Sequence, residues 1–195
     1  MSSRYSADDT YCYPGSDVLK NKLGLLNQNQ LDLADADYCA IRIVELNEKP
    51  IQGSFDLSHL KKIHHALFQD VYDWAGEVRT VDLTLKDSRF ANAQYIEENA
   101  NKLFKELAGE QHLKNLNFDE LAPRLAYYLS EINVIHPFRD GNGRAQRIFI
   151  AQLCKNLGHQ INYSDLDEGE FYAAMENAFF ADETPLTKLI QKILK

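Results

Sequence analysis

Apolar residues recur every three or four positions along most of the chain, and this spacing is typical of amphipathic helices. The clearest helix is predicted at 117–136, where a capping box of Asn117 and Glu120 marks the start and Pro137 prevents continuation. Its apolar positions are Phe118, Leu121, Leu125, Tyr128, Leu129, Ile132 and Ile135. A coarse pass over the rest predicts helices at 17–27, 30–48, 57–74, 95–108, 143–157, 167–180 and 184–194. The fold class is therefore expected to be mainly α.

The segment 78–95 departs from helical spacing. Val81, Leu83 and Leu85 alternate with polar residues, as expected for a strand, and the polar run 86–89 supplies a turn. We therefore predict one β-hairpin here. It needs support from neighbouring helices, because an isolated hairpin is only marginally stable.

The composition indicates a single domain covering residues 1–195, with an irregular segment at 1–16. The chain has 195 residues, of which 45% are hydrophobic, and this is enough for one substantial core. The net charge of −8 argues against direct binding to nucleic acid or to anionic membranes, since both need basic surface. An apolar run of transmembrane length and a secretory signal are both lacking, so a cytoplasmic location is expected.

The cysteines and a group of histidines give no metal-binding pattern. The three cysteines are widely spaced, without a Cys-x-x-Cys pair, and are expected to be reduced and structural: Cys12, Cys39 and Cys154. His59, His64 and His65 lie in a predicted helix without a paired ligand motif. We expect these histidines to lie on the surface or to contact a partner.

Residues that can carry out chemistry gather between the helices predicted at 117–136 and 143–157. Residues 136–147 read His-Pro-Phe-Arg-Asp-Gly-Asn-Gly-Arg-Ala-Gln-Arg. A histidine can relay a proton near neutral pH, a carboxylate can hold a hard divalent cation, and glycines let backbone N–H groups approach an anion. The start of the second helix would direct its unpaired N–H groups at the same point, which is a common way to bind phosphate.

The alternative interpretation is an ordinary turn between helices, with His136 bonded at the helix end and the arginines in solvent. Each of these residues taken alone would fit an ordinary turn. Together they do not, because Arg144 and Arg147 would both lie in the first turn of a helix, where the dipole disfavours each cation by roughly 0.3–1 kcal/mol. A bound polyanion removes this conflict. The segment therefore predicts a site for a phosphorylated ligand.

This segment resembles, at every fixed position, the signature of the Fic family, His-x-Phe-x-(Asp/Glu)-Gly-Asn-Gly-Arg-x-x-Arg. Two other stretches are similar to Fic proteins, namely 67–79 and the early 13–15 together with 19–22. The resemblance thus spans nearly the whole chain. It implies the Fic fold, a helical bundle with a β-hairpin flap at 78–95 beside an active-site loop at 136–147.

Most Fic enzymes transfer AMP from ATP to a hydroxyl group of a target protein. The resemblance therefore implies an enzyme, a protein adenylyltransferase, that uses ATP as substrate and Mg²⁺ as cofactor. In this scheme His136 is the general base that takes the proton of a target Tyr, Ser or Thr while its oxygen attacks the α-phosphorus. Asp140 holds the Mg²⁺, and Phe138 points into the core in a structural role.

The resemblance assigns the other motif residues to the phosphates. Backbone N–H groups around Gly141 and Gly143, with the side chain of Asn142, would stabilise the charge that develops on the α-phosphate. Arg144 and Arg147 would bind the β- and γ-phosphates.

The family also uses its hairpin flap to hold an extended segment of the target by strand addition. Leu83, Leu85 and Lys86 are therefore assigned to target docking, and Phe90 to clamping the docked chain or the nucleotide. A plain surface hairpin packed on the core is the alternative.

Phe171 and Tyr172 align with aromatic positions that border the adenine in some relatives. The alternative is that this helix simply packs into the core, because its apolar positions have helical spacing: Phe171, Ala174, Met175 and Phe179.

Fic enzymes are commonly inhibited by a helix with the sequence (Ser/Thr)-x-x-x-Glu-(Gly/Asn), whose glutamate pairs with the second motif arginine, here Arg147. Residues 164–169 match this pattern, but they directly follow the motif helix, and we interpret them as a helix start with a capping box at Asp165 and Glu168. The resemblance then implies a stand-alone bacterial toxin that is restrained by a separate small antitoxin carrying the inhibitory helix. Its family-based target is a type II topoisomerase such as DNA gyrase.

Other functions stay open at this point. The kinase-like branch of the family has a basic residue in place of the second glycine, so Gly143 favours AMP transfer. Transfer of another phosphate-linked group, such as UMP or phosphocholine, fits the same core, as does a secreted, host-directed effector. A non-enzymatic interaction module is disfavoured, because a binding-only site needs neither His136 nor Asp140. The sequence does not identify the target, the modified residue, the antitoxin or the oligomeric state.

Overall fold

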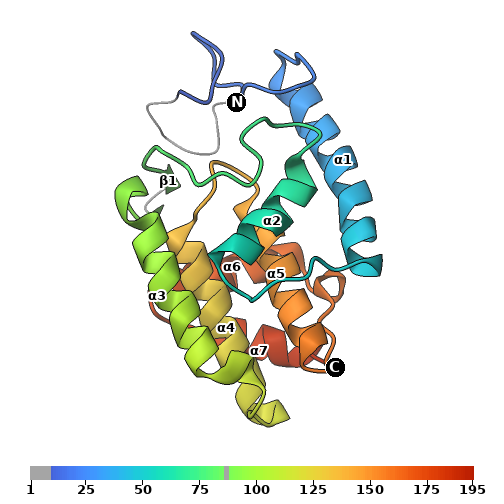
Figure 1. Cartoon of the computed structure of the whole chain (residues 1–195), viewed down its shortest axis with the longest axis vertical. Helices are drawn as coiled ribbons and strands as arrows, with labels where there is room; N and C mark the ends of the chain where they lie inside the picture. The colour runs from blue at the N-terminus through green and yellow to red at the C-terminus, as the bar shows by residue number, and fades with distance from the viewer. Residues whose placement is uncertain (1–9, 86–87) are drawn as a thin grey trace.

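Helices account for most of the computed structural model, which describes residues 10–85 and 88–195. The α-helices are α1 (Gln28–Glu48), α2 (Leu57–Phe68), α3 (Ile96–Gly109), α4 (Phe118–Ile135), α5 (Asn142–Asn156), α6 (Glu168–Phe179) and α7 (Thr184–Ile193). Short 3-10 turns lie at Ala93–Tyr95, Gln111–Leu113 and Tyr163–Asp165. The predicted mainly α fold class is confirmed (Figure 1).

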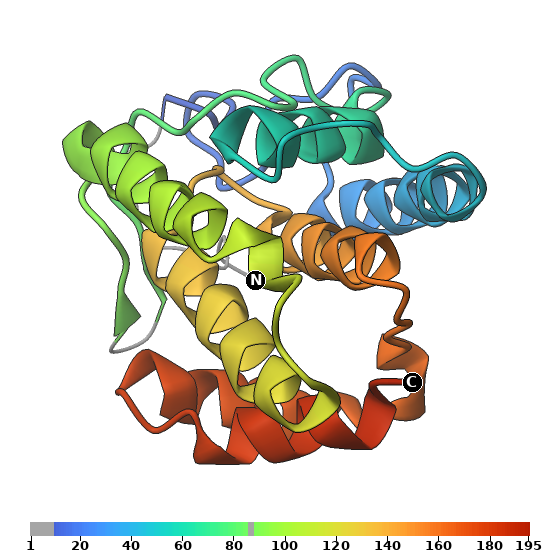
Figure 2. The same cartoon turned by 60° about the horizontal axis from the view of Figure 1, so that its bottom comes forward.

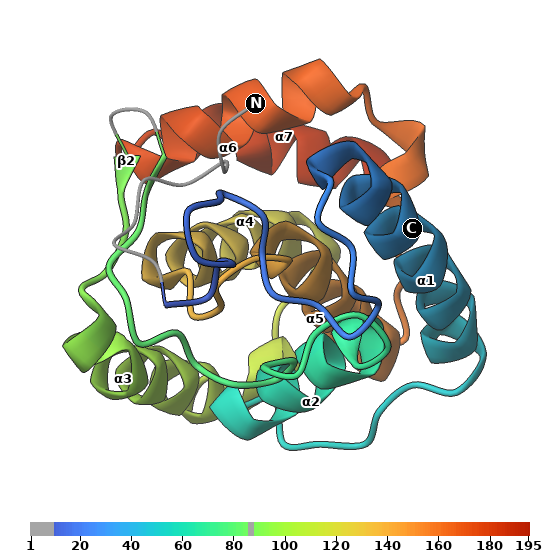
Figure 3. The same cartoon turned by 90° about the horizontal axis from the view of Figure 1, so that it is seen from above.

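Helices α4 and α5 form the centre of the molecule, and the other helices surround them (Figure 3). Helices α6 and α7 pack along one side of α4, while α2, with α1 beside it, covers α5 from the opposite side (Figure 2). The central position of α4 follows from its sequence, since Leu125, Ala126 and Leu129 are fully buried. The loop between α4 and α5 is therefore held by helices on several sides.

Helix α4 has the ends that its sequence predicts. The Asn117 side chain accepts hydrogen bonds from the first turn and Glu120 reaches back to the N–H of Asn117, which completes the capping box. The helix ends before His136, which adopts the left-handed conformation with φ 48° and ψ 63°. Phe118 was predicted to face the core but is 45% exposed, because it lies in the first turn, where it contacts His159.

Two helix predictions are wrong. Residues 17–27 form turns and an isolated bridge between Cys12 and Leu19 instead of a helix. The Asn21 side chain bonds to the backbone of Leu19 and Leu25, and such local bonds compete with helix formation. The helix predicted at 57–74 ends at Phe68, and the chain then turns. The other predicted helices agree with the structure to within two residues at each end.

The predicted hairpin is present but short. Strands β1 (Thr84–Leu85) and β2 (Ser88–Arg89) are antiparallel, with Thr84 opposite Arg89 and Leu85 opposite Ser88. Leu83 and Phe90 flank the strands and are buried, whereas Leu85 is exposed. Lys86, the other predicted docking residue, lies outside the described residues.

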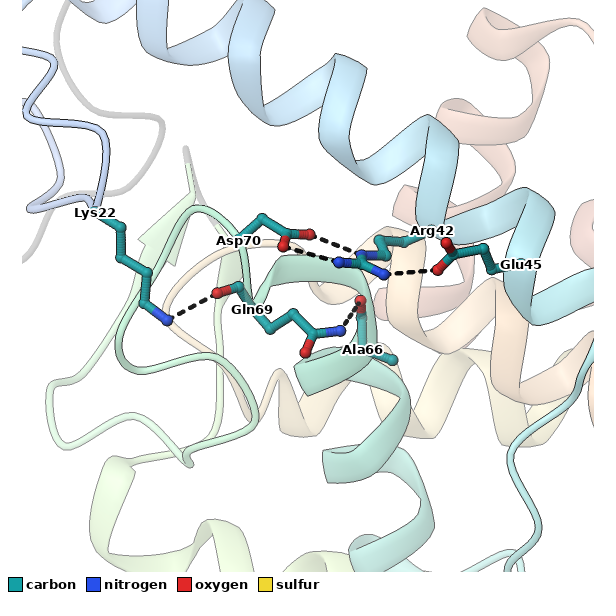
Figure 4. A network of polar contacts seen from close by, with 6 residues as sticks. All are labelled: Lys22, Arg42, Glu45, Ala66, Gln69 and Asp70. Atoms are coloured by element: carbon teal, nitrogen blue, oxygen red, sulfur yellow. Dashed lines mark hydrogen bonds and ion pairs between the residues drawn. The ribbon is translucent and has the colours of Figure 1, made fainter.

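A polar network joins the N-terminal segment, α1 and the end of α2 (Figure 4). Arg42 of α1 donates Nε to Asp70 Oδ2 (2.7 Å) and Nη2 to Asp70 Oδ1 (2.8 Å), and its Nη1 bonds to Glu45. Lys22 Nζ donates to the carbonyl oxygen of Gln69 (2.8 Å). Because a two-point arginine–carboxylate pair fixes both distance and orientation, this network sets the position of α1 against α2.

No helix in the described part of the chain is long and apolar enough to cross a bilayer.

Candidate active site

The loop from His136 to Gly141 is tied to itself by Asn142. The N–H of Phe138 donates to Asn142 Oδ1 (2.9 Å), and Asn142 Nδ2 donates to the carbonyl oxygen of Phe138 (2.8 Å). Asn142 is only 3% exposed. Its amide therefore shapes the loop. The backbone N–H groups at the start of α5 are then better placed than this side chain to meet a phosphate.

Gly141 is the point where the loop turns into α5. Its φ is +76°, and a Cβ atom added there would lie 2.3 Å from the ring of Phe68. Only glycine fits such a conformation and such a close approach without strain. The start of α5 can approach Phe68 of α2 this closely because Gly141 has no side chain.

We expect Gly141→Ala to lower the free energy of unfolding by at least about 1–2 kcal/mol, the cost of the left-handed conformation, with the clash against Phe68 added to it. Urea unfolding followed by circular dichroism measures this change. Gly143→Ala is the matched control. A Cβ at Gly143 meets only Arg147 Nη1 at 3.7 Å, so this variant should be as stable as the wild type or more stable. Equal losses in both variants would contradict the account.

His136 is buried and held in one orientation. Its side chain is stacked on Phe90 of the hairpin, with ring centroids 3.7 Å apart and planes at 18°. Nδ1 lies 3.2 Å from the carbonyl oxygen of Asn133. A carbonyl can only accept, so Nδ1 carries the proton and Nε2 carries the lone pair of the neutral ring. Burial lowers the pKa of His136 to about 3. The side chain is therefore neutral at pH 7, in the tautomer that a base acting through Nε2 requires.

His64 was predicted to lie on the surface or to contact a partner, and this prediction is wrong. It is fully buried and stacks on Phe138 with ring centroids 3.8 Å apart. Gly76 N–H donates to Nδ1 (2.8 Å), so Nε2–H donates to the carbonyl oxygen of Asp140 (2.9 Å). His64 thus holds the backbone of the active-site loop. Its spacing to Leu60, four residues before it, was the signal for a core position.

His59 is buried as well, which also contradicts the prediction, and it bonds to Ile51 and Gln152. Only His65 of the three is exposed.

Stability is expected to fall as the pH drops below about 6.5. Burial lowers the pKa of both His64 and His136 to about 3 in the folded protein. Below the ordinary pKa the unfolded chain binds these two protons and the folded chain does not, so each histidine costs about 1.4 kcal/mol per pH unit. Urea unfolding at about pH 7 and about pH 5 measures the slope. The exposed control His65→Ala should keep it, and equal stability at both pH values would contradict the account.

Arg79 is a functional residue that the sequence analysis did not single out. Its guanidinium donates to the carbonyl oxygens of His136 (2.8 Å), Val81 (2.6 Å), Ala91 (2.6 Å) and Ile135 (3.3 Å), and it is only 1% exposed. Val81 and Ala91 belong to the two arms of the hairpin. One side chain therefore ties the flap to the end of α4 and to the backbone of His136. Arg79 is the last residue of the 67–79 stretch that resembles Fic proteins, and this position was the sequence signal that could have pointed to it.

Arg144 lies in the first turn of α5, as predicted, whereas Arg147 lies in the second turn, because the helix begins at Asn142. The two arginines also have different neighbours. Arg144 forms an ion pair with Asp35 of α1, and its Cζ lies 4.5 Å from the ring centroid of Phe68. Arg147 lies with its Cζ 5.8 Å from the ring centroid of Phe171. Phe171 is buried beside the motif arginine, whereas Tyr172 is 55% exposed.

Asp140 is the carboxylate proposed for a metal ion. Its Oδ1 accepts from the N–H of Gly141 (2.7 Å), which places the carboxylate at the N-terminus of α5. Residues 10–85 and 88–195 contain no group of three side chains from His, Cys, Asp and Glu that could form a metal cage. One carboxylate fits Mg²⁺, because this ion is usually held by one or two carboxylates together with substrate phosphates and water.

A model of the Fic/DOC family matches residues 54–154, which include the whole loop and both motif arginines. The chain belongs to the Fic/DOC family. The predicted resemblance and the Fic fold are thus confirmed.

Two curated relatives are similar to the chain over its whole length. The chain is 39% identical over 194 residues to the protein adenylyltransferase VbhT of Bartonella schoenbuchensis, covering 100% of this chain and 41% of VbhT. It is 37% identical over 195 residues to Fic of Escherichia coli K12, named a probable protein adenylyltransferase, of which 96% is covered. The chain therefore spans less than half of VbhT but nearly all of the second relative.

Solved structures of Fic domains have the same fold. The BepC effector of Bartonella tribocorum, crystallised with bound AMPPNP, superposes with a TM-score of 0.87 at 29% identity, over 95% of this chain and 96% of BepC. The Fic domain of an effector from Bartonella quintana, with bound ADP, gives a TM-score of 0.88 at 29% identity, over 95% of this chain and 94% of that one. Each of these two Fic domains thus holds an adenine nucleotide in its crystal structure.

Proposed function

We propose that this Fic protein is a protein adenylyltransferase that transfers AMP from ATP to a Tyr, Ser or Thr hydroxyl of a target protein. The observation that carries the proposal is the buried, neutral His136, fixed with its lone pair on Nε2 in the loop that leads to the N-terminus of α5. The names of VbhT and of the E. coli relative, and the AMPPNP bound to BepC, support the same activity.

The proposed reaction uses these positions. Nε2 of His136 takes the proton from the target hydroxyl as its oxygen attacks the α-phosphorus, and the bond from that phosphorus to the bridging oxygen breaks to release pyrophosphate. The negative charge of the bound phosphates favours the protonated imidazole and so raises the low pKa of His136 toward the range of a working base. The backbone N–H groups of Asn142 and Gly143 would stabilise the charge that develops on the α-phosphate, next to Gly141, whose own N–H is donated to Asp140 Oδ1.

Asp140, Arg144 and Arg147 supply the remaining groups for the triphosphate. Asp140 would hold a Mg²⁺ ion, whose charge offsets that of the phosphates when bound. The two arginines would bind the β- and γ-phosphates. Phe171, which lies beside Arg147, would border the adenine together with Tyr172.

The hairpin is proposed to dock the target. Leu85 is exposed on β1, where an extended segment could pair by strand addition, and Leu83 is buried below it and supports the strand. Phe90 connects this strand pair to the base through its stack on His136. A target chain paired here would place its hydroxyl close to the histidine.

We further propose that the chain acts as one Fic domain over 1–195, in the cytoplasm, as a bacterial toxin that a separate antitoxin inhibits and that modifies a type II topoisomerase. In support, Glu168, the glutamate of the matching segment 164–169, is exposed in the first turn of α6. The cap of α6 is Asp167, which bonds to the N–H of Glu170, so the capping box predicted at Asp165 is wrong. A secreted effector is the alternative location.

The target is tested by incubating the protein with bacterial lysate, Mg²⁺ and ATP labelled at the α-phosphate, and by identifying the labelled band with mass spectrometry. A topoisomerase subunit carrying AMP on a hydroxyl residue is the expected result. Labelling of other proteins only would contradict the target. Labelling that unlabelled UTP suppresses better than unlabelled ATP would instead indicate transfer of UMP.

A further inference from the structure

Asp35 of α1 is a buried carboxylate in contact with the motif, although it belongs to none of the segments that resemble the Fic signature. It is only 6% exposed. Tyr72 donates its hydroxyl to Asp35 Oδ2 (2.9 Å), and Arg144 donates Nη1 to Asp35 Oδ1. Burying a charged carboxylate costs free energy unless the carboxylate is hydrogen-bonded and paired with a cation. Asp35 has both kinds of partner.

The contacts of Arg144 fix the direction of its guanidinium. Asp35 binds one end of the fork through Nη1, and the ring of Phe68 covers one face, with Cζ 4.5 Å from its centroid. A guanidinium has five donors in a planar fork, so binding at one end leaves donors at the other end. A free arginine side chain carries about 2 kcal/mol of rotamer entropy, and these contacts remove much of it before a ligand arrives.

The location of Arg144 is unfavourable for a cation without a partner. Arg144 lies in the first turn of α5, where the helix dipole repels a cation. The carboxylate offsets this repulsion. Asp35 is itself held in place, because Arg42 and Asp70 fix α1 to the end of α2. Tyr72, which donates to Asp35, lies only two residues after Asp70.

We propose that Asp35 is a positioning residue that, together with the hydroxyl of Tyr72, aims Arg144 at the β- and γ-phosphates of ATP. This inference rests on the proposed function, since it concerns how that function's substrate is bound. Asp35 acts through Arg144 and does not contact the nucleotide. Its removal should therefore weaken binding of the triphosphate and leave binding of AMP nearly unchanged.

The test measures the affinity of the whole chain for AMPPNP and for AMP, each with Mg²⁺, by isothermal titration calorimetry. For Asp35→Asn we expect the Kd for AMPPNP to rise roughly 10- to 100-fold, as for loss of a charged hydrogen bond, while the Kd for AMP changes less than about twofold. Tyr72→Phe keeps the ring and removes only the hydroxyl, so a smaller rise of a few-fold is expected. Asp37→Asn, an exposed carboxylate on the same helix, is the matched control and should change neither affinity.

A double-mutant cycle separates positioning from general structural support. In an Arg144→Ala background, Asp35→Asn should cause no further loss of AMPPNP affinity, because the group through which it acts is gone. Thermal unfolding shows whether each variant is folded. If Asp35→Asn does not fold, the same measurements are made on Tyr72→Phe. An unchanged or tighter Kd for AMPPNP, an equal loss for AMP, or the same loss in the Arg144→Ala background would overturn the inference. A wild-type chain that binds no adenine nucleotide would instead overturn the proposed function.

Discussion

His136→Ala is expected to lower the rate of AMP transfer by roughly 10²–10⁴-fold, the usual contribution of a positioned general base. The variant removes the imidazole whose Nδ1 bonds to Asn133 and whose Nε2 holds the lone pair. Transfer is measured as label from the α-phosphate of ATP that stays on the target protein. The affinity for AMPPNP should change little, because the phosphate site at the start of α5 is intact.

His65→Ala is the matched control for this substitution. His65 is an exposed histidine on α2 and lies outside the site, so its replacement should leave the transfer rate unchanged. A His136→Ala protein that is folded, binds AMPPNP and still transfers AMP at the rate of the wild type would show that another group is the base.

Arg79→Met is expected to lower the free energy of unfolding by about 3–5 kcal/mol, the cost of breaking a buried charged network. The substitution leaves four backbone carbonyl groups without their donor, at His136, Val81, Ala91 and Ile135. Two of these groups belong to the hairpin, so the flap should also lose its fixed position relative to the base. Urea unfolding measures the stability, and the protection of the hairpin amides against hydrogen exchange reports the loosening.

Arg89→Met provides the comparison in the same hairpin. Arg89 is 69% exposed in its side chain and lies 3.7 Å from Asp82, and pairs of this kind contribute about 0–1 kcal/mol. A loss for Arg79→Met that is no larger than the loss for Arg89→Met would contradict the role of Arg79 as the link between the flap and the active-site loop.

Local sequence signals predicted the parts of the fold that depend on neighbouring residues. The capping box at Asn117 and the proline after His136 located both ends of α4, because caps and prolines act within one helical turn. The same reasoning failed at 17–27, where the side chain of Asn21 bonds to the nearby backbone and tertiary contacts such as Lys22 N–H to the carbonyl oxygen of Val71 hold the chain in turns.

The motif residues of the site were predictable, whereas their supports were not. Residues 136–147 lie together because they are consecutive, and the family match includes them. His64 and Arg79 reach the loop, and Asp35 reaches Arg144 of α5, from distant parts of the chain. One sequence contains no signal for such pairings. The burial of His64 could have been inferred from helical spacing, but its bond to the carbonyl oxygen of Asp140 depends on the packing of α2 against α5.

In the proposed reaction the bound nucleotide loses its AMP portion to a protein hydroxyl, with His136 as the base. The most direct test incubates the wild type and His136→Ala with lysate, Mg²⁺ and ATP labelled at either the α- or the γ-phosphate. We expect protein-bound label from the α-phosphate only, and only with the wild type. Label retained from the γ-phosphate would mean kinase-like transfer, and equal α-label with both proteins would contradict the role of His136.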